Sequence, residues 1–283
     1  MPAPHRIAVV GHVEHVTAGS VAALPAPGDI AHLVAPQWFP GGGGGVTFFQ
    51  LLQSPAEIHL FTAIGDDDAG SAVAARLAAT RAVVHAARRA APHTRDLVLV
   101  TPGGERTIVV IGEPLQARFD DPLPWEVLGT CDAVFFTGQD ADVLRAARAT
   151  RLLVVSARRR PVLVRSGVRA DLVVGSVSDP LEASTLADYP VPPAALVMTD
   201  GAAGGRIETR DGTARFDAAP APPLRRGSYG AGDSFVGALT WYAACGLPVP
   251  EACRRAAPYG AAVLGGATPL EHQLRLEPVS AGG

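Results

Sequence analysis

The stretch "YGAGDSFVGALTWYAACG" (229–246) sets three small residues and an aspartate directly before a long apolar run of helical length. Gly230, Ala231 and Gly232 allow backbone N–H groups to converge at the start of a helix, where the helix dipole adds partial positive charge. Such a turn suits a phosphate and the charge that develops during its transfer. Asp233 then has two interpretations. It caps the helix, or it accepts a proton from an attacking hydroxyl beside the anion site.

A second glycine cluster, "VMTDGAAGG" (197–205), follows a buried apolar strand. In open α/β sheets, ligands bind at the carboxyl ends of the strands. Thr199, Gly201 and Gly204 form a Thr-x-Gly-x-x-Gly turn that would let a flat or phosphorylated ligand approach the backbone. An ordinary tight turn has the same composition, so the cluster alone leaves both interpretations open.

A third cluster, the five glycines from Gly41 to Gly45, precedes another apolar run of helical length. Glycine loses more conformational entropy on folding than other residues, so five in a row need a reason. We interpret them as a place where a ligand lies against the main chain. A flexible hinge is the alternative.

Short apolar runs and helical patterns alternate along most of the chain. Strands are predicted at 6–12, 57–70 (ending in an acidic turn), 132–138, 151–157, 170–176 and 195–201, and helices at 71–80 and 141–150. Buried strands that alternate with helices predict a mainly parallel sheet covered on both faces. The segments 13–18, 29–39 and 94–112 differ because they alternate with period two and carry polar residues. They predict a small accessory sheet, or lid, inserted in the main domain.

Two groups of polar residues near these elements could bind a metal ion or a substrate. The acidic turn "GDDDAG" (65–70) reads as a helix-capping turn rather than a metal site, because a single acidic cluster lacks a complete ligand set. His12 and Glu14 would point to one side of a strand. We expect them to make polar contacts to a substrate.

Charge and hydropathy indicate a soluble enzyme. The net charge is −3, with 48% hydrophobic and 18% charged residues, so nothing suggests nucleic acid or a membrane surface as a partner. No apolar stretch approaches the roughly 20 residues that span a bilayer. The N-terminal residues enter an apolar strand without a signal-peptide layout, which predicts a cytoplasmic protein.

The chain contains no lysine, and all 24 basic residues are arginine. A Walker A loop and a protein kinase each need a lysine at the phosphates, and a pyridoxal enzyme needs one for its Schiff base. All three classes are therefore disfavoured. An NAD-binding Rossmann enzyme is also disfavoured, because the first strand leads into "GHVEH" rather than Gly-x-Gly-x-x-Gly.

Taken together, these motifs resemble the ribokinase-like (PfkB) family of carbohydrate and nucleoside kinases. The resemblance runs in the same order over nearly the whole chain 1–283, which would be a single kinase domain. It rests on "VVGHVE", the glycine run followed by "GDDDAG", "GERTIVV", "VMTDGAAGG" and above all "GAGDSFVGAL". It implies a Rossmann-like three-layer α/β/α domain with a small β-sheet lid. The lid of this family closes over a sugar and often forms dimers.

The resemblance also implies roles for individual residues. The chain would transfer the γ-phosphoryl group of ATP to a hydroxymethyl group of a small sugar or nucleoside, with Asp233 as the base. The anion hole would comprise Gly230, Ala231, Gly232 and Asp233. The nucleotide would lie at Thr199, Gly201, Gly204 and Ser176, and the acceptor at Glu14, His12, Gly41, Gly42 and Gly43.

The sequence departs from the family on the acceptor and metal side. Val46 stands where the family usually has an asparagine, and Glu14 would have to replace an aspartate after the first strand. The family's Asn-x-x-Glu element appears as Ser176-x-x-Asp179. Asp179, with Glu182 nearby, would hold Mg²⁺ through water. A monovalent cation near 265–269 and a homodimer through the lid stay open, as does a catalytically silent sensor or scaffold with a kinase-like fold.

Overall fold

The computed structural model describes residues 5–279, and its main element is a nine-stranded sheet in the order β13-β12-β11-β10-β9-β8-β1-β4-β5. The strands from β5 to β11 run parallel. They are β1 (Arg6–Val10), β4 (Glu57–Gly65), β5 (Val83–Arg89), β8 (Ala133–Phe136), β9 (Leu152–Ser156), β10 (Leu172–Ser176) and β11 (Ala195–Thr199). An antiparallel hairpin of β12 (Gly205–Thr209) and β13 (Gly212–Phe216) completes one edge. The predicted, mainly parallel sheet is confirmed.

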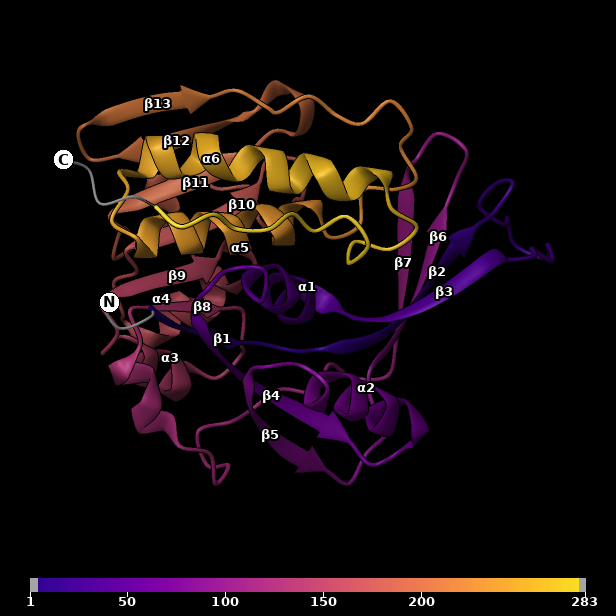
Figure 1. The fold of residues 1–283 in the computed structure, drawn as a ribbon, viewed down its shortest axis with the longest axis horizontal. Helices are drawn as coiled ribbons and strands as arrows, with labels where there is room; N and C mark the ends of the chain where they lie inside the picture. Colours follow the sequence, from indigo (N-terminus) through magenta and orange to yellow (C-terminus); the bar gives the residue numbers. More distant parts are fainter. Residues whose placement is uncertain (1–4, 280–283) are drawn as a thin grey trace.

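Helices cover both faces of this sheet, which gives three layers (Figure 1). One face carries α1 (Gly42–Leu51), α2 (Asp68–Ala78), α5 (Ala231–Ala244) and α6 (Val249–Ala262), and the other carries α3 (Ala141–Ala147) and α4 (Arg160–Ser166). Short 3₁₀ turns lie at Trp125–Thr130, Ala157–Arg159, Leu186–Asp188, Gly201–Ala203 and Val263–Gly265.

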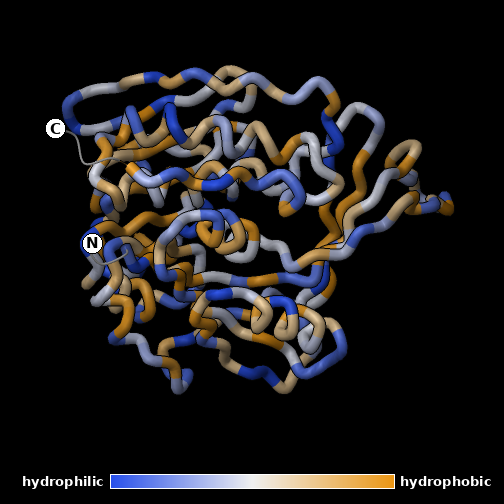
Figure 2. The backbone as a smooth tube through the Cα atoms, viewed as in Figure 1, coloured by the Kyte–Doolittle hydropathy of each residue, from blue (hydrophilic) through white to orange (hydrophobic). Residues whose placement is uncertain are grey.

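Alternate residues of the central strand enter the two cores. Ile7 and Val9 pack in the core under α1 and α5, whereas Ala8 and Val10 pack in the core under α3 and α4. Strands buried on both faces need apolar residues at consecutive positions, which explains the unbroken apolar runs of the sequence. Figure 2 shows the hydrophobic colour concentrated in the interior strands.

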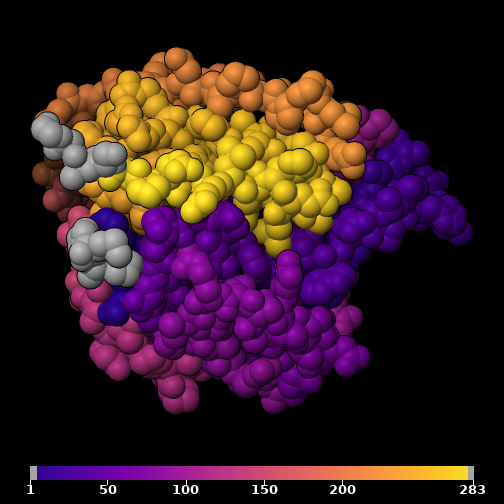
Figure 3. All heavy atoms as spheres, viewed as in Figure 1, coloured from indigo at the N-terminus to yellow at the C-terminus, as the bar shows by residue number. Residues whose placement is uncertain are grey.

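A second, four-stranded sheet projects from the main body (Figure 3). Its order is β3-β2-β6-β7, and its strands are β2 (Glu14–Ser20), β3 (Val34–Gly41), β6 (Arg95–Val100) and β7 (Arg106–Ile111). A small core of Val16, Ala18, Phe39 and Val98 holds it together. The predicted α/β fold class, with a three-layer domain and a small additional β-sheet, is confirmed.

Some boundaries differ from those expected. Residues 29–33 form no strand, because the pairing of β2 with β3 extends only to Ser20 and Val34. Helix α2 begins at Asp68, three residues before the expected start. Its N-cap is Asp67, whose carboxylate accepts a hydrogen bond from Gly70 N, so the capping interpretation of the acidic turn is confirmed. Within residues 5–279, no helix is both long and apolar enough to cross a bilayer.

Candidate active site

The candidate residues gather at one edge of the main sheet, where the parallel strands end. His12 follows β1, Thr137 follows β8, Arg158 follows β9 and Asp179 follows β10. The parallel pairing of β1 with β8, β8 with β9 and β9 with β10 brings these carboxyl ends side by side. This edge is where open α/β sheets bind ligands.

Asp233 lies in the first turn of α5 but does not cap it. The N-cap is Gly230, whose φ of 78° is in the left-handed region, and no side chain makes a capping hydrogen bond. The interpretation of Asp233 as the helix cap is therefore wrong. Burial raises the pKa of the Asp233 carboxyl, and the nearby charges of Arg106 and Arg158 partly oppose that rise.

The backbone around Asp233 is tied to α1. Thr47 Oγ1 donates a hydrogen bond of 3.1 Å to Asp233 O. The first N–H groups of a helix have no intrahelical acceptor, so those of Gly232 and Asp233 point out of the N-terminus of α5. The start of α5 thus offers backbone donors to an anion, and the anion hole expected from the sequence stays a prediction.

The glycine run forms the first turn of α1 rather than a loop before it. Gly41 is the N-cap, and Gly42 N donates to the hydroxyl of Tyr229 at 2.9 Å. Of the five glycines, only Gly43 is partly exposed. A Cβ atom on Gly43 would lie 3.3 Å from Asp233 Oδ1, so the run and the aspartate face each other across the site.

His12 and Glu14 lie beside this turn, with His12 Nε2 3.6 Å from Glu14 Oε1. Gly43 N donates to His12 Nε2 at 3.3 Å, which requires an unprotonated nitrogen there. Burial, and then the charges of Arg159 and Arg158, lower the pKa of His12 to about 3, so the ring is neutral at physiological pH.

Glu14 has an acidic neighbour on the second sheet. Asp96, on β6, is 4% exposed, and its carboxyl acts on that of Glu14. Burial, and then Asp96, raise the pKa of Glu14 to about 9. Burial also raises the pKa of Asp96. One of the two carboxyls therefore holds a proton at neutral pH, so the pair offers both a donor and acceptors.

The predicted nucleotide residues lie at the ends of two neighbouring strands. Ser176 of β10 pairs in register with Thr199 of β11, and Thr199 Oγ1 donates to Gly175 O at 3.2 Å. Gly201 and Gly204 have φ angles of +49° and +81°. A Cβ on Gly204 would lie 2.0 Å from Phe216 O, so packing against the end of β13 itself requires glycine at that position.

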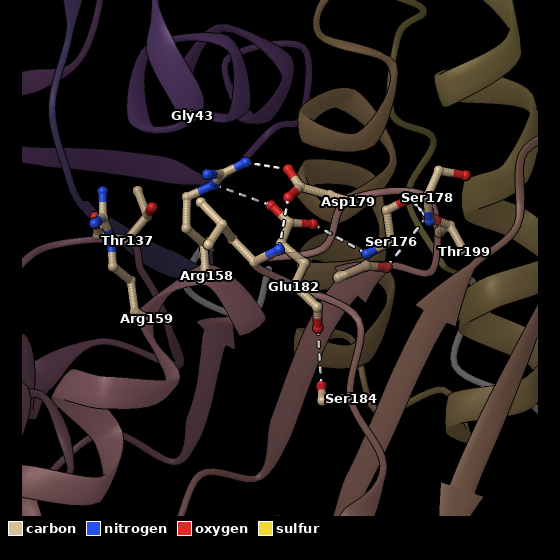
Figure 4. A network of polar contacts seen from close by, with 12 residues as sticks. Gly43, Thr137, Arg158, Arg159, Ser176, Ser178, Asp179, Glu182, Ser184 and Thr199 are labelled. Atoms are coloured by element: carbon tan, nitrogen blue, oxygen red, sulfur yellow. Dashed lines mark hydrogen bonds and ion pairs between the residues drawn. The ribbon is translucent and has the colours of Figure 1, made fainter. Parts of the chain in front are cut away.

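The predicted magnesium ligands, Asp179 and Glu182, both contact the guanidinium of Arg158 (Figure 4). The two carboxylates belong to a network with Ser176, Ser178 and Thr199 on one side. Within residues 5–279, no group of three or more histidine, cysteine, aspartate or glutamate side chains is arranged to hold a metal ion. Each of the two carboxylates is thus paired with Arg158, and the water-mediated magnesium site expected at Asp179 and Glu182 stays a prediction.

Sequence reasoning missed several residues that line the site. They are Asp96, Arg106, Thr137, Arg158, Arg159 and Tyr229. Arg159 Nε donates to Thr137 O at 2.8 Å, so the two basic residues after β9 both turn toward the site. The signal was available: in a chain without lysine, "ARRR" (157–160) directly follows a buried strand.

The arrangement is the ribokinase-like kinase fold, and the resemblance to that fold predicted from the sequence is confirmed. No protein-family model matches the chain, and no curated protein matches it in sequence. Among solved structures, adenosine kinase from Sinorhizobium meliloti has a TM-score of 0.78 at 16% identity, over 96% of this chain and 98% of that one.

Two other solved structures cover the chain in the same way. Ribokinase from Thermotoga maritima has a TM-score of 0.74 at 14% identity, over 94% of this chain and 95% of that one. The nucleoside kinase from Methanocaldococcus jannaschii has a TM-score of 0.71 at 13% identity, over 95% and 94%. The TM-scores establish the shared fold, and at identities this low the comparisons establish nothing more. The activity of this chain is therefore inferred from its own site.

Proposed function

We propose that the chain is a kinase that transfers the γ-phosphoryl group of ATP to a hydroxymethyl group of a small sugar-like or nucleoside-like molecule. The observation that carries the proposal is the Asp233 carboxyl. It makes no capping bond, it faces Gly43, the one partly exposed glycine of the run, and it stands beside N–H groups at the start of α5 that have no intrahelical acceptor. A carboxylate beside an anion site has a use when it must take a proton from an attacking hydroxyl.

The proposed step is an in-line displacement. The acceptor hydroxyl gives its proton to Asp233, and its oxygen forms a bond to the γ-phosphorus. The bond between that phosphorus and the oxygen bridging to the β-phosphate breaks, and ADP leaves with the electron pair. The turn of Gly230, Ala231 and Gly232 and the N–H of Asp233 stabilise the charge on the transferring group.

The two substrates take opposite sides of Asp233. In this proposal, His12 and Glu14 bind hydroxyl groups of the acceptor while Gly41, Gly42 and Gly43 let it approach the backbone. The nucleotide lies over Ser176, Thr199, Gly201 and Gly204. Magnesium would accompany the nucleotide phosphates, where it neutralises charge, and no step is assigned to an ion held by the protein.

A substrate panel tests the proposal. The protein is incubated with ATP, Mg²⁺ and a series of sugars, polyols and nucleosides, and mass spectrometry is used to find a phosphate adduct. Asp233→Asn is the matched inactive variant, and we expect it to fold and lose about 10²–10⁴-fold in turnover. Asp211→Asn, at an exposed turn, is the control with normal activity. Binding without a product across the panel would instead indicate a sensor.

A further inference from the structure

Arg158 reaches from the end of β9 to the loop after β10. Its Nε lies 3.4 Å from Glu182 Oε1, and its Nη2 pairs with Asp179 Oδ2. In Figure 4 the guanidinium lies between Gly43 and Thr137 on one side and Ser176 and Thr199 on the other. Arg158 thus stands between the acceptor side and the nucleotide side of the proposed site.

Each of the two carboxylates is fixed at both of its oxygens. Glu182 Oε2 accepts a hydrogen bond from Ser176 N at 3.0 Å, and Asp179 Oδ1 accepts one from Leu181 N at 2.9 Å. The other oxygen of each carboxylate contacts Arg158. Each carboxylate therefore already has a cationic partner and a backbone donor while the arginine is in place. Together they hold the guanidinium plane in one orientation.

The charge of Arg158 acts on the residues proposed for catalysis. It lowers the pKa of Asp233, and it contributes to the low pKa of His12. The guanidinium carries five N–H donors, and the two carboxylates use only part of them. The Arg158 side chain is 39% exposed, so the remaining donors are open to a ligand.

Phosphoryl transfer needs positive charge close to the oxygens of the transferring group. The chain has no lysine that could supply it. A guanidinium held by two carboxylates is oriented in advance, and its planar fork matches the oxygens of a phosphate.

We propose that Arg158 is a catalytic residue that contacts the transferring phosphoryl group, and that Asp179 and Glu182 orient its guanidinium instead of binding magnesium directly. This inference rests on the proposed function. The reaction is the same: the acceptor oxygen bonds to the γ-phosphorus, and the bond from that phosphorus to the bridging oxygen of ADP breaks. Arg158 adds charge-assisted hydrogen bonds to the γ-phosphoryl oxygens, which hold the group in line and offset the negative charge spread over these oxygens during transfer.

Manganese binding tests the placement of the carboxylates without any turnover. Electron paramagnetic resonance with Mn²⁺ and nucleotide-free protein should detect no ion at this site in the wild type. Arg158→Ala should create a Mn²⁺ site, which Arg158→Ala combined with Asp179→Asn should lose. The inference is overturned if the wild type binds Mn²⁺ and Asp179→Asn removes it, or if Arg158→Ala gains no binding.

Binding of a phosphoryl mimic tests the catalytic role. Calorimetry would compare ADP alone with ADP, Mg²⁺ and aluminium fluoride. Aluminium fluoride and Mg²⁺ should tighten the binding of ADP to the wild type. In Arg158→Ala this gain in affinity should be smaller by at least about tenfold, because a charged donor is removed, while the affinity for ADP alone should be normal. Arg160→Ala, from the same run of arginines, should keep the fluoride effect. No fluoride effect in the wild type, or an unchanged one in Arg158→Ala, would overturn the assignment.

These readouts separate the two proposals. If the substrate panel yields no product but the fluoride effect depends on Arg158, the proposed acceptor class fails and the role of Arg158 stands. If a product forms and Arg158→Ala keeps full turnover, the proposed function stands and the role of Arg158 fails.

Discussion

A Cβ atom on Gly43 would lie 3.3 Å from Asp233 Oδ1 and 3.7 Å from Thr137 Oγ1, so Gly43 and Asp233 face each other at the proposed acceptor site. Gly43→Ala should place a methyl group where the acceptor hydroxyl meets its base. We expect the KM for the acceptor to rise by about tenfold or more, because one misplaced methyl group costs about 1–3 kcal/mol in a tight pocket. Steady-state kinetics on the acceptor found in the panel checks this.

Gly42→Ala is the matched comparison for that variant. Gly42 has a φ of +77°, and a Cβ there would lie 2.8 Å from Glu14 Oε2. An alanine in the left-handed region costs about 1–2 kcal/mol even without a clash. Thermal unfolding should therefore show a clear loss of stability for Gly42→Ala and little change for Gly43→Ala. Equal losses in both variants would contradict this steric account.

The pH dependence of turnover should report on Asp233. Burial raises the pKa of this carboxyl above its usual range, and the base must be ionised to accept a proton. Activity should therefore rise with pH through a limb above the ordinary aspartate range. Arg106→Ala should move this limb to still higher pH, because the Arg106 charge lowers the pKa of Asp233. A limb that stays in place in this variant would argue against Asp233 as its source.

The stability of the ligand-free protein should fall as pH rises through the range set by Glu14. Its pKa rises from 4.5 to about 9 on folding, so the folded chain keeps a proton that the unfolded chain releases. Glu14 thus stabilises the fold most below pH 4.5, and that contribution is lost by about pH 9. Burial also raises the pKa of Asp96, which gives a pH dependence of stability in the same direction. The charge of Arg159 lowers the pKa of Glu14 and so partly opposes the effect of burial there.

Glu14→Gln removes the titrating group but keeps a polar side chain of similar shape. Its midpoint of thermal unfolding should depend less on pH between 5 and 9 than that of the wild type. Glu113→Gln, at an exposed position, should follow the wild-type curve. Parallel curves for the wild type and Glu14→Gln would mean that the Glu14 carboxyl does not hold this proton.

Much of the fold could be predicted from the sequence because buried parallel strands are unbroken apolar runs. The edge strand Val83–Arg89 was missed, since "VVHAARR" carries three polar residues among its seven. Helix α6 was also missed, because Pro258 interrupts its helical pattern. Both elements form because of tertiary contacts with the rest of the chain, which the local sequence pattern does not show.

The site was partly predictable for a related reason. Glycines and an aspartate at the start of a helix leave a local signature, and Gly41–Gly45 and Asp233 do lie together. The arginines after β9 did leave a signal in the run 157–160, but the role of Arg158 could not be predicted, because its partners Asp179 and Glu182 reach it only through the pairing of β9 with β10. Asp96 was hidden too, since a polar residue in an alternating strand normally faces solvent, whereas this one is buried against Glu14.

The small sheet has an apolar outer strand that suits self-association. Ile108, Val109, Val110 and Ile111 of β7 are between 40% and 52% exposed, and β7 lies at the edge of its sheet. Exposed apolar edge strands tend to pair with another chain. We therefore propose a homodimer through β7, which light scattering after size exclusion would detect. Val109→Glu should shift the protein to the mass of one chain, and a wild type that is already monomeric would contradict the proposal.

The guanidinium group of Arg158 lies between the two halves of the proposed site, and that of Arg159 lies beside Thr137. Because the chain has no lysine, acylating reagents and amine-directed crosslinkers find no side-chain amine to modify there. Acylation therefore cannot neutralise the positive charge of the site. Dicarbonyl reagents, which react with guanidinium groups, should in contrast modify the site. The half-exposed Arg158 would meet them directly, and a bound nucleotide would shield it.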